Sequence, residues 1–135
     1  MRARIRKAFT LVEILIVVVI LGILAAIVVP QFTNAADEAQ VGNVQTQLQT
    51  IRNQIELYRA QHSGDVPPSF DDGTWDDLVG PQYLKTAPIN PRNGNSAIGT
   101  GTDHTGGADT DGWVWDAATN SMFAKGFNEQ TKQWE

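Results

Sequence analysis

Glu13 is the single charged residue in an apolar stretch, FTLVEILIVVVILGILAAIVV, that covers residues 9–29. A carboxylate inside a membrane-spanning segment is costly because hydrocarbon solvates charge poorly, so such a residue usually has a function. A cation that loses its water together with the carboxylate would compensate for that cost. Glu13 is therefore a candidate for pairing with a cation. The alternative is that it lies at the headgroup level and only marks topology.

A second candidate site is the Gly-rich loop, residues 93–112 (NGNSAIGTGTDHTGGADTDG), which has almost no apolar side chains and is expected to bury nothing. Four aspartates in and next to this loop offer the oxygen ligands that calcium prefers: Asp103, Asp109, Asp111 and Asp116. Their spacing does not reproduce an EF-hand. A solvated, turn-rich loop is the alternative interpretation. His62 and His104 stand alone in the sequence and are not expected to bind a metal.

Catalytic patterns are not found in the sequence: there is no Ser/His/Asp set, no pair of catalytic carboxylates and no phosphate-binding loop. An enzyme is therefore the least expected class. Trp113 and Trp115 share one face of a predicted strand and could form a carbohydrate platform. Packing in the core is favoured, because a small sheet needs such cover to be stable.

The element that must position Glu13 is a helix over residues 9–29. At 1.5 Å per residue it is roughly 30 Å long, about the thickness of a bilayer's hydrocarbon core. Four cationic side chains precede it: Arg2, Arg4, Arg6 and Lys7. The positive-inside rule predicts a cytoplasmic N-terminus and an extracytoplasmic C-terminal region. A secretory signal peptide is disfavoured, because its apolar part has 7–15 residues and no acid. A plain membrane anchor is the other alternative.

Residues 30–62 are predicted to continue as an amphipathic helix. Gly22 loosens the helix, and Pro30 bends it without necessarily ending it. Apolar residues then recur at steps of three and four, and are expected to pack on the protein's own sheet: Val41, Val44, Leu48, Ile51, Ile55 and Tyr58. Residues 63–64, followed by two prolines, end the helix.

Residues 63–135 are predicted to form one small soluble region. It contains a short helical turn around residues 74–79 and a β-hairpin of residues 113–116 and 121–124. Residues 127–135 could add an edge strand that ends at Trp134. The sequence thus predicts an α+β fold in which a long N-terminal helix packs on a small antiparallel sheet.

The segment KAFTLVEILIVVVILGILAAIVVP resembles the N-terminal signal of type IV pilins and of the pseudopilins of type II secretion systems. The resemblance implies that a prepilin peptidase removes the basic leader, residues 1–8, by cleaving between Ala8 and Phe9. It also implies N-methylation of Phe9. The residue before the cut is usually Gly in the family and is Ala8 here. By the same resemblance, Glu13 meets the N-terminal amine of a neighbouring subunit, and Gly22 and Pro30 are helix-loosening positions.

This resemblance implies that the protein is a structural subunit, most similar to the major pseudopilin. Such a protein forms a homopolymer with other pilin-like subunits, is lifted by an inner-membrane platform and its ATPase, and drives secretion across the outer membrane. Major pseudopilins hold calcium in a C-terminal loop, which makes calcium a candidate cofactor here. The nearest alternative is a type IV pilin, serving adhesion, motility or DNA uptake. A membrane-anchored binding module is the third. The absence of cysteine and the short chain favour the pseudopilin.

The charge balance bears on partners and location. The leader holds four of the ten basic residues, so its removal leaves six basic against fifteen acidic residues. This acidic balance argues against nucleic-acid binding. The expected location is the inner membrane, with the C-terminal region in the periplasm or in an assembled filament.

Overall fold

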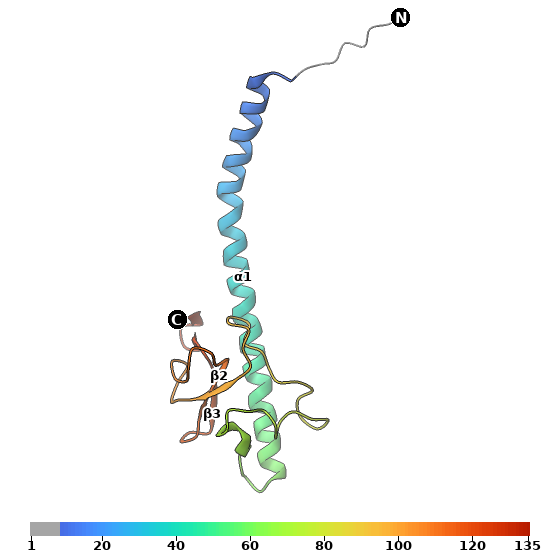
Figure 1. The fold of residues 1–135 in the computed structure, drawn as a ribbon, viewed down its shortest axis with the longest axis vertical. Coiled ribbons are helices and arrows are strands. Elements are labelled where there is room, and N and C mark those ends of the chain that lie inside the picture. Colours follow the sequence, from blue (N-terminus) through green and yellow to red (C-terminus); the bar gives the residue numbers. More distant parts are fainter. Residues whose placement is uncertain (1–8) are drawn as a thin grey trace, which may run out of the picture. The chain divides into compact units, whose positions relative to one another are not determined.

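The computed structural model of the protein describes residues 9–135, apart from the side chain of residue 33 (Figure 1). Its elements are α1 (Leu11–Gln61), the 3-10 helix η1 (Pro68–Phe70), β1 (Ile98–Thr100), β2 (Trp113–Asp116), β3 (Ser121–Ala124), β4 (Phe127–Asn128) and β5 (Gln133–Trp134). The chain divides within α1 into two compact units, residues 1–37 and 38–135, which are described separately. The predicted division into a leader, a membrane helix, an amphipathic helix and a soluble region stays a prediction.

The described part of the first unit is the N-terminal portion of α1. Its large apolar side chains are exposed all around the helix, among them Leu11 at 81 % and Phe32 at 71 %, and Phe9 just before the helix is 80 % exposed. The helix is long and apolar enough, by length and composition, to cross a membrane. It continues through Pro30 without interruption, as predicted. A helix that is apolar on every side needs lipid or other helices around it.

In the second unit, α1 buries the predicted apolar stripe. Five of its six members are at most 9 % exposed and one is partly buried: Val44, Leu48, Ile51, Ile55, Tyr58 and Val41. They form one core with aromatic side chains of the C-terminal region, among them Phe70, Trp75 and Trp113. The helix ends as predicted, with Ser63 at a φ of 59°. The Gly64 N–H then donates to the Arg59 carbonyl at 2.8 Å, which satisfies a free carbonyl of the last turn.

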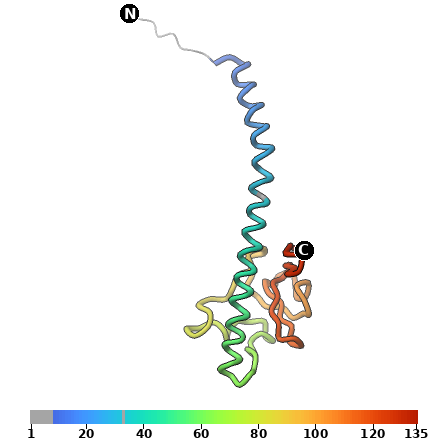
Figure 2. The backbone as a smooth tube through the Cα atoms, turned by 180° about the vertical axis from the view of Figure 1, so that it is seen from behind, coloured from blue at the N-terminus to red at the C-terminus, as the bar shows by residue number. Residues whose placement is uncertain are grey.

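The predicted hairpin is confirmed with the expected bounds. β2 and β3 pair antiparallel, with Trp113 opposite Ala124, and both lie beside the C-terminal part of α1 in Figures 1 and 2. β1 pairs with β2 in parallel, with Ile98 opposite Trp113. The sheet has the order β1-β2-β3 and is mixed rather than purely antiparallel. The α+β architecture predicted from the sequence is confirmed.

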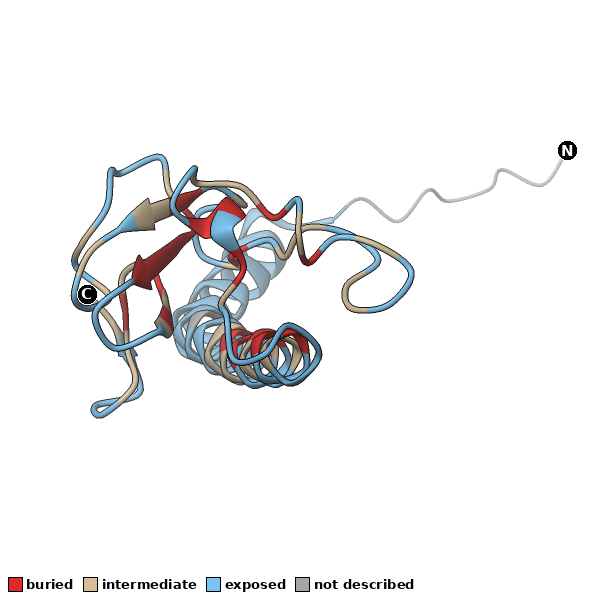
Figure 3. Cartoon of the chain, turned by 90° about the horizontal axis from the view of Figure 1, so that it is seen from below, coloured by how far each residue is buried: buried red, intermediate tan, exposed pale blue. Residues whose placement is uncertain are grey.

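The Gly-rich loop was expected to bury nothing, and this is wrong. All four residues of β2 are buried, including Val114 on the face opposite the two tryptophans. Figure 3 shows buried segments in the strands and in the C-terminal part of α1. A Cβ atom added to Gly101 would lie 3.0 Å from Val114 Cγ1 and 2.7 Å from the Cα of Gly106. The backbone of the loop therefore packs directly on Val114, where glycine is the residue that allows the approach.

The two tryptophans are core residues. Trp113 and Trp115 are 0 % and 1 % exposed, which excludes an open carbohydrate platform at these rings. The indole of Trp113 donates to the Pro88 carbonyl at 3.0 Å. Trp115 packs on Phe70, with ring centroids 4.9 Å apart. The interpretation as core packing is confirmed.

One smaller expectation is confirmed and another needs correction. Around residues 74–79 the chain makes the predicted short helical turn, in which the N–H groups of Leu78 and Val79 donate to the Trp75 carbonyl at 2.9 Å and 2.8 Å. A 3-10 helix that was not predicted forms earlier, at η1. Consecutive prolines favour that position because their φ is already helical. The C-terminal residues do not add an edge strand to the main sheet. β4 and β5 instead form a separate two-stranded sheet, in which Trp134 packs on Phe127.

Candidate functional site at the start of helix α1

Thr10 and Glu13 form a reciprocal pair at the N-terminus of α1. Glu13 Oε2 accepts hydrogen bonds from the Thr10 backbone N–H at 2.8 Å and from the Thr10 hydroxyl at 2.9 Å. The Glu13 N–H donates to Thr10 Oγ1 at 3.2 Å. This is a capping box: the residue before the helix and the third residue inside it satisfy each other's free backbone donors.

The capping box leaves part of the Glu13 carboxylate available. All three hydrogen bonds involve Oε2 or the backbone, and within residues 9–135 no partner is found for Oε1. The bonds to Thr10 hold the carboxylate at the N-terminal end of the helix. That end also carries the positive end of the helix dipole, which favours a negative charge there. The arrangement can present one carboxylate oxygen to a cation from outside this chain.

Thr10 is a helix-capping partner of Glu13 that the sequence interpretation missed. Its signal is present, because T-x-x-E directly before an apolar run is the sequence signature of a capping box. Ala8 and the leader lie outside the described residues, so the cleavage site stays a prediction. Phe9, the predicted new N-terminus, is exposed. Around Gly22, which is predicted to loosen the helix, nothing lies within 4 Å of an added Cβ atom.

The four candidate calcium ligands do not meet in one site. Asp103 accepts from the N–H and hydroxyl of Thr105, Asp111 accepts from the Ala108 N–H, and Asp116 accepts from Ala118 and Thr119. Asp109 is exposed. Among the described residues, no group of three or more His, Cys, Asp or Glu side chains could hold a metal ion. The four aspartates therefore do not converge on one metal position, and calcium binding stays a prediction.

These local bonds explain the titration of two of the carboxyl groups. The hydroxyl and then the N–H of Thr105 lower the pKa of Asp103 from its ordinary value of 3.8. The Thr119 hydroxyl, at 2.5 Å from Oδ2, is the largest cause that lowers the pKa of Asp116. Hydrogen bonds donated to a carboxylate stabilise its charged form. Both aspartates thus hold the turns of their own segments.

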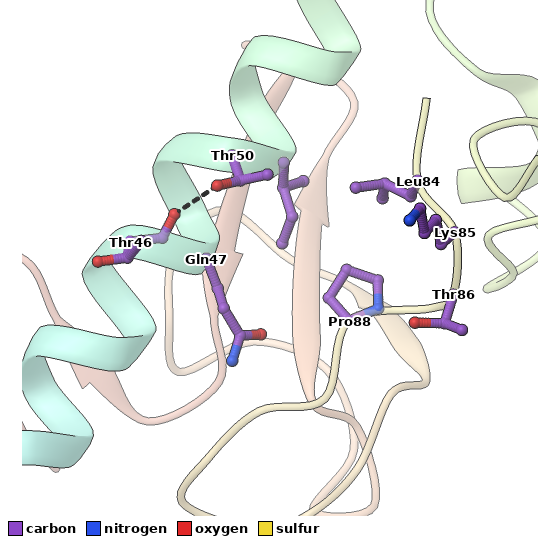
Figure 4. Close-up of a pocket in the computed structure, with 8 residues that line it drawn as sticks. Thr46, Gln47, Thr50, Leu84, Lys85, Thr86 and Pro88 are labelled. Carbon is purple, nitrogen blue, oxygen red and sulfur yellow. Dashed lines mark hydrogen bonds between the residues drawn. The ribbon is translucent and has the colours of Figure 1, made fainter. Parts of the chain in front are cut away.

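A groove lies between α1 and the segment of residues 84–88 (Figure 4). It has a volume of about 260 Å³ and is lined by Thr46, Gln47, Thr50, Ile51, Leu84, Lys85, Thr86 and Pro88. The Thr50 hydroxyl donates to the Thr46 carbonyl at 2.8 Å, and the Thr46 hydroxyl donates to the Gly42 carbonyl at 2.9 Å. Both hydroxyls are therefore committed to the helix, and Lys85 is the single charged residue of the lining. The groove holds no acid–base pair that could catalyse a reaction.

Comparison with known proteins finds a family match that includes the start of the helix. The family described as prokaryotic N-terminal methylation motif matches residues 3–29. Type II secretion system core protein G of Pseudomonas aeruginosa is 36 % identical over 104 residues, which cover 67 % of this chain and 71 % of that protein. The protein of the same name from Vibrio cholerae is 34 % identical over 94 residues, covering 70 % and 58 %.

Type IV pilus proteins match a smaller share of the chain. The type IV narrow pilus major component PilA5 of Thermus thermophilus is 41 % identical over 58 residues, which cover 43 % of this chain and 50 % of that protein. The chain thus spans about half to seven tenths of the length of these three relatives. No solved structure matches significantly. By its methylation motif and its identity to core protein G over most of its length, the chain belongs to the type IV pilin-like family of type II secretion system core protein G.

Proposed function

We propose that the protein is a structural subunit of a pilus-like filament, the pseudopilus of a type II secretion system. The observation that carries this proposal is the exposed apolar portion of α1, which carries one acidic residue, Glu13, in its capped first turn. The match to core protein G supports the secretion filament, because it covers 67–70 % of the chain. A type IV pilin remains the second candidate, supported by pilus relatives that match 38–43 % of the chain.

The apolar portion of α1 suits two environments in turn. Before assembly its side chains face lipid, and in a filament they face the same portion of neighbouring subunits. Lipid tails are as apolar as leucine, so moving the helix from one to the other gives little hydrophobic driving force. A polar contact among these helices therefore has a large influence on how they align.

Glu13 provides that contact. The leader is removed between Ala8 and Phe9 by a prepilin peptidase, which creates a new amine at Phe9, and this amine is then methylated. Thr10 holds one oxygen of the Glu13 carboxylate, and the other is available to the amine of an incoming subunit. Pairing compensates each charge for the water that it loses in the apolar surroundings. A subunit at the wrong depth would leave both charges unpaired.

The same proposal implies the location of the subunit and its assembly partners. The precursor spans the inner membrane with a cytoplasmic N-terminus, and residues 38–135 lie in the periplasm. An inner-membrane platform and its ATPase lift subunits into the filament, together with other pilin-like subunits. The acidic balance of the processed chain disfavours a nucleic-acid partner.

The mass of the N-terminal peptide tests the proposal against a plain membrane anchor. We expect protein extracted from membranes to begin with methylated Phe9 and to be present in filaments sheared from cells. Intact Met1 together with absence from the sheared fraction would identify an anchor. Processed protein in surface filaments of cells that lack the secretion system would favour the type IV pilin.

A further inference from the structure

The ammonium group of Lys125 is surrounded by three consecutive backbone carbonyls of the Gly-rich loop. Nζ donates to the carbonyl oxygens of Thr105 at 3.0 Å, Gly106 at 2.9 Å and Gly107 at 3.3 Å. Lys125 itself lies directly after β3, about 20 positions further along the chain. One side chain thus closes a contact between two segments that the sequence separates.

A positive charge stabilises such a convergence of carbonyls. Three oxygens that point to one place bring their partial negative charges together, and they repel each other unless a positive charge lies between them. Backbone carbonyls are also common ligands of calcium in loops. An ammonium group has three N–H donors and no acceptor, so three carbonyls complete its hydrogen bonding.

The backbone on both sides of this contact is fixed. The Lys125 N–H donates to the Gly112 carbonyl at 3.0 Å, and the Asn90 side chain donates to the Lys125 carbonyl at 3.2 Å. On the loop, the Gly107 N–H donates to the Thr100 carbonyl at 3.1 Å. The lysine side chain therefore connects two positioned segments rather than two mobile ones.

Neighbouring bonds hold the same two segments together. The Gly126 N–H donates to the His104 carbonyl at 2.9 Å, and His104 Nε2 lies 3.2 Å from Glu135 Oε2. The loop carbonyls are thus presented from a stretch that is tied down just before and just after residues 105–107. The aspartates of the loop, by contrast, serve their own turns and leave these carbonyls to Lys125.

We propose that the Lys125 ammonium is the resident cation of the Gly-rich loop and takes the position in which a divalent ion would otherwise hold its carbonyl oxygens. The Lys125 side chain, rather than a bound metal ion, then holds the Gly-rich loop in its position over Val114. The loop does not need calcium to fold. This inference rests on the loop geometry and is independent of the proposed filament.

Two measurements on the full chain in detergent test the proposal. First, the melting temperature is compared in calcium and in EDTA, for the wild type, for Lys125→Met and for the control Lys85→Met, which changes a lysine of the groove. We expect the wild type to melt at the same temperature in both. Lys125→Met should melt several degrees lower and be cut by protease within residues 101–111, while Lys85→Met should behave as the wild type.

The second measurement needs no variant and so is unaffected if Lys125→Met fails to fold. Brief acylation of the folded wild type, followed by peptide mass spectrometry, should modify Lys125 more slowly than Lys85. Unfolding in denaturant should abolish the difference. A wild type that calcium stabilises, equal acylation of the two lysines in the folded chain, or Lys125→Met with the melting temperature of Lys85→Met would overturn the proposal.

Discussion

Arg52 and Glu129 lie 77 positions apart, yet their side chains form two hydrogen bonds, at 2.8 Å and 2.6 Å. The same guanidinium donates to the Met122 carbonyl at 2.7 Å. One side chain of α1 thus holds both β3 and the turn between β4 and β5. The planar guanidinium suits this role because its donors are fixed in a fork that matches a carboxylate.

Loss of this contact should be measurable although both side chains are 35 % exposed. Arg52→Met keeps an unbranched apolar stem and removes all three hydrogen bonds, so we expect the second unit to lose about 1–2 kcal/mol of stability. In a domain of this size each kcal/mol lowers the melting temperature by about 4–8 °C. Thermal melting followed by circular dichroism measures the change.

The control is Glu56→Gln, which breaks the exposed Arg59–Glu56 pair within α1. Glu56 is 67 % exposed, and the pair joins residues three apart on one helix. We expect a change within about 0.5 kcal/mol. A loss from Glu56→Gln equal to that from Arg52→Met would contradict the role assigned to Arg52.

Replacement of Gly106 by alanine tests the packing of the Gly-rich loop on Val114. The added Cβ would lie 2.7 Å from the Cα of Gly101 and 3.2 Å from Val114 Cγ1, so the backbone of the loop must move. We expect a loss of about 1–3 kcal/mol, as is usual for overpacking. Denaturant unfolding monitored by tryptophan fluorescence provides the measurement.

Gly80→Ala is the matched control for this glycine. Nothing lies within 4 Å of a Cβ atom at Gly80, so its stability should change by at most about 0.5 kcal/mol. If Gly106→Ala were as stable as Gly80→Ala, the close approach between the loop and Val114 would not exist in solution.

Acid should destabilise the second unit through the lowered pKa values of Asp103 and Asp116. A carboxyl whose pKa is lower in the folded chain than in the unfolded chain contributes stability above the unfolded pKa, and this is lost as the pH falls through the folded pKa. We therefore expect the melting temperature to fall from about pH 5 downward. Asp116→Asn should melt lower at pH 7 and depend less on pH in this range.

Asp109→Asn is the control for the acid measurement, because Asp109 is exposed in the loop. We expect it to follow the wild-type curve from pH 7 to acid. An Asp116→Asn variant that lost as much stability on acidification as the wild type would show that Asp116 does not contribute to the acid dependence.

The long helix and the hairpin could be predicted because their signals are local. The apolar stripe from Val44 to Tyr58 follows the helical period, and two short alternating segments flank a turn at residues 117–120. β1 could not be predicted, because its three residues contain one large apolar side chain and pair with a strand that begins 15 positions later. Its parallel pairing depends on the whole fold.

The burial of Val114 could not be predicted for a different physical reason. Hydropathy reports side chains, whereas the cover over Val114 is the backbone of Gly101 and Gly106. At the candidate site, Glu13 was recognisable by its charge in an apolar run. Thr10 was recognisable only through its spacing to Glu13. The bonds of the loop aspartates with their own neighbours required the structure.

Substitutions at Ala8 test the predicted cleavage site. A peptidase that cuts between Ala8 and Phe9 should require a small residue before the cut. Ala8→Leu should therefore leave an unprocessed precursor in the membrane, whereas Ala8→Gly should be processed at least as well as the wild type. Electrophoretic mobility and peptide mass distinguish the two forms. Normal processing of Ala8→Leu would place the peptidase site elsewhere.

Two variants distinguish the role of the Glu13 charge in assembly from the role of Glu13 in the helix cap. Glu13→Gln removes the charge, but glutamine can replace glutamate in a capping box. Thr10→Val removes the hydroxyl of the cap and keeps the charge. If the charge aligns incoming subunits, Glu13→Gln should be processed and remain in the membrane, while Thr10→Val should still assemble.

The most direct measurement is the fraction of processed subunit that appears in sheared filaments for the wild type, Glu13→Gln and Thr10→Val. The wild type and both variants should begin at methylated Phe9, which would confirm that each one reaches the membrane and the peptidase. We expect filaments from the wild type and from Thr10→Val, and almost none from Glu13→Gln. A wild-type yield of filaments from Glu13→Gln would contradict the role of this charge in the alignment of subunits.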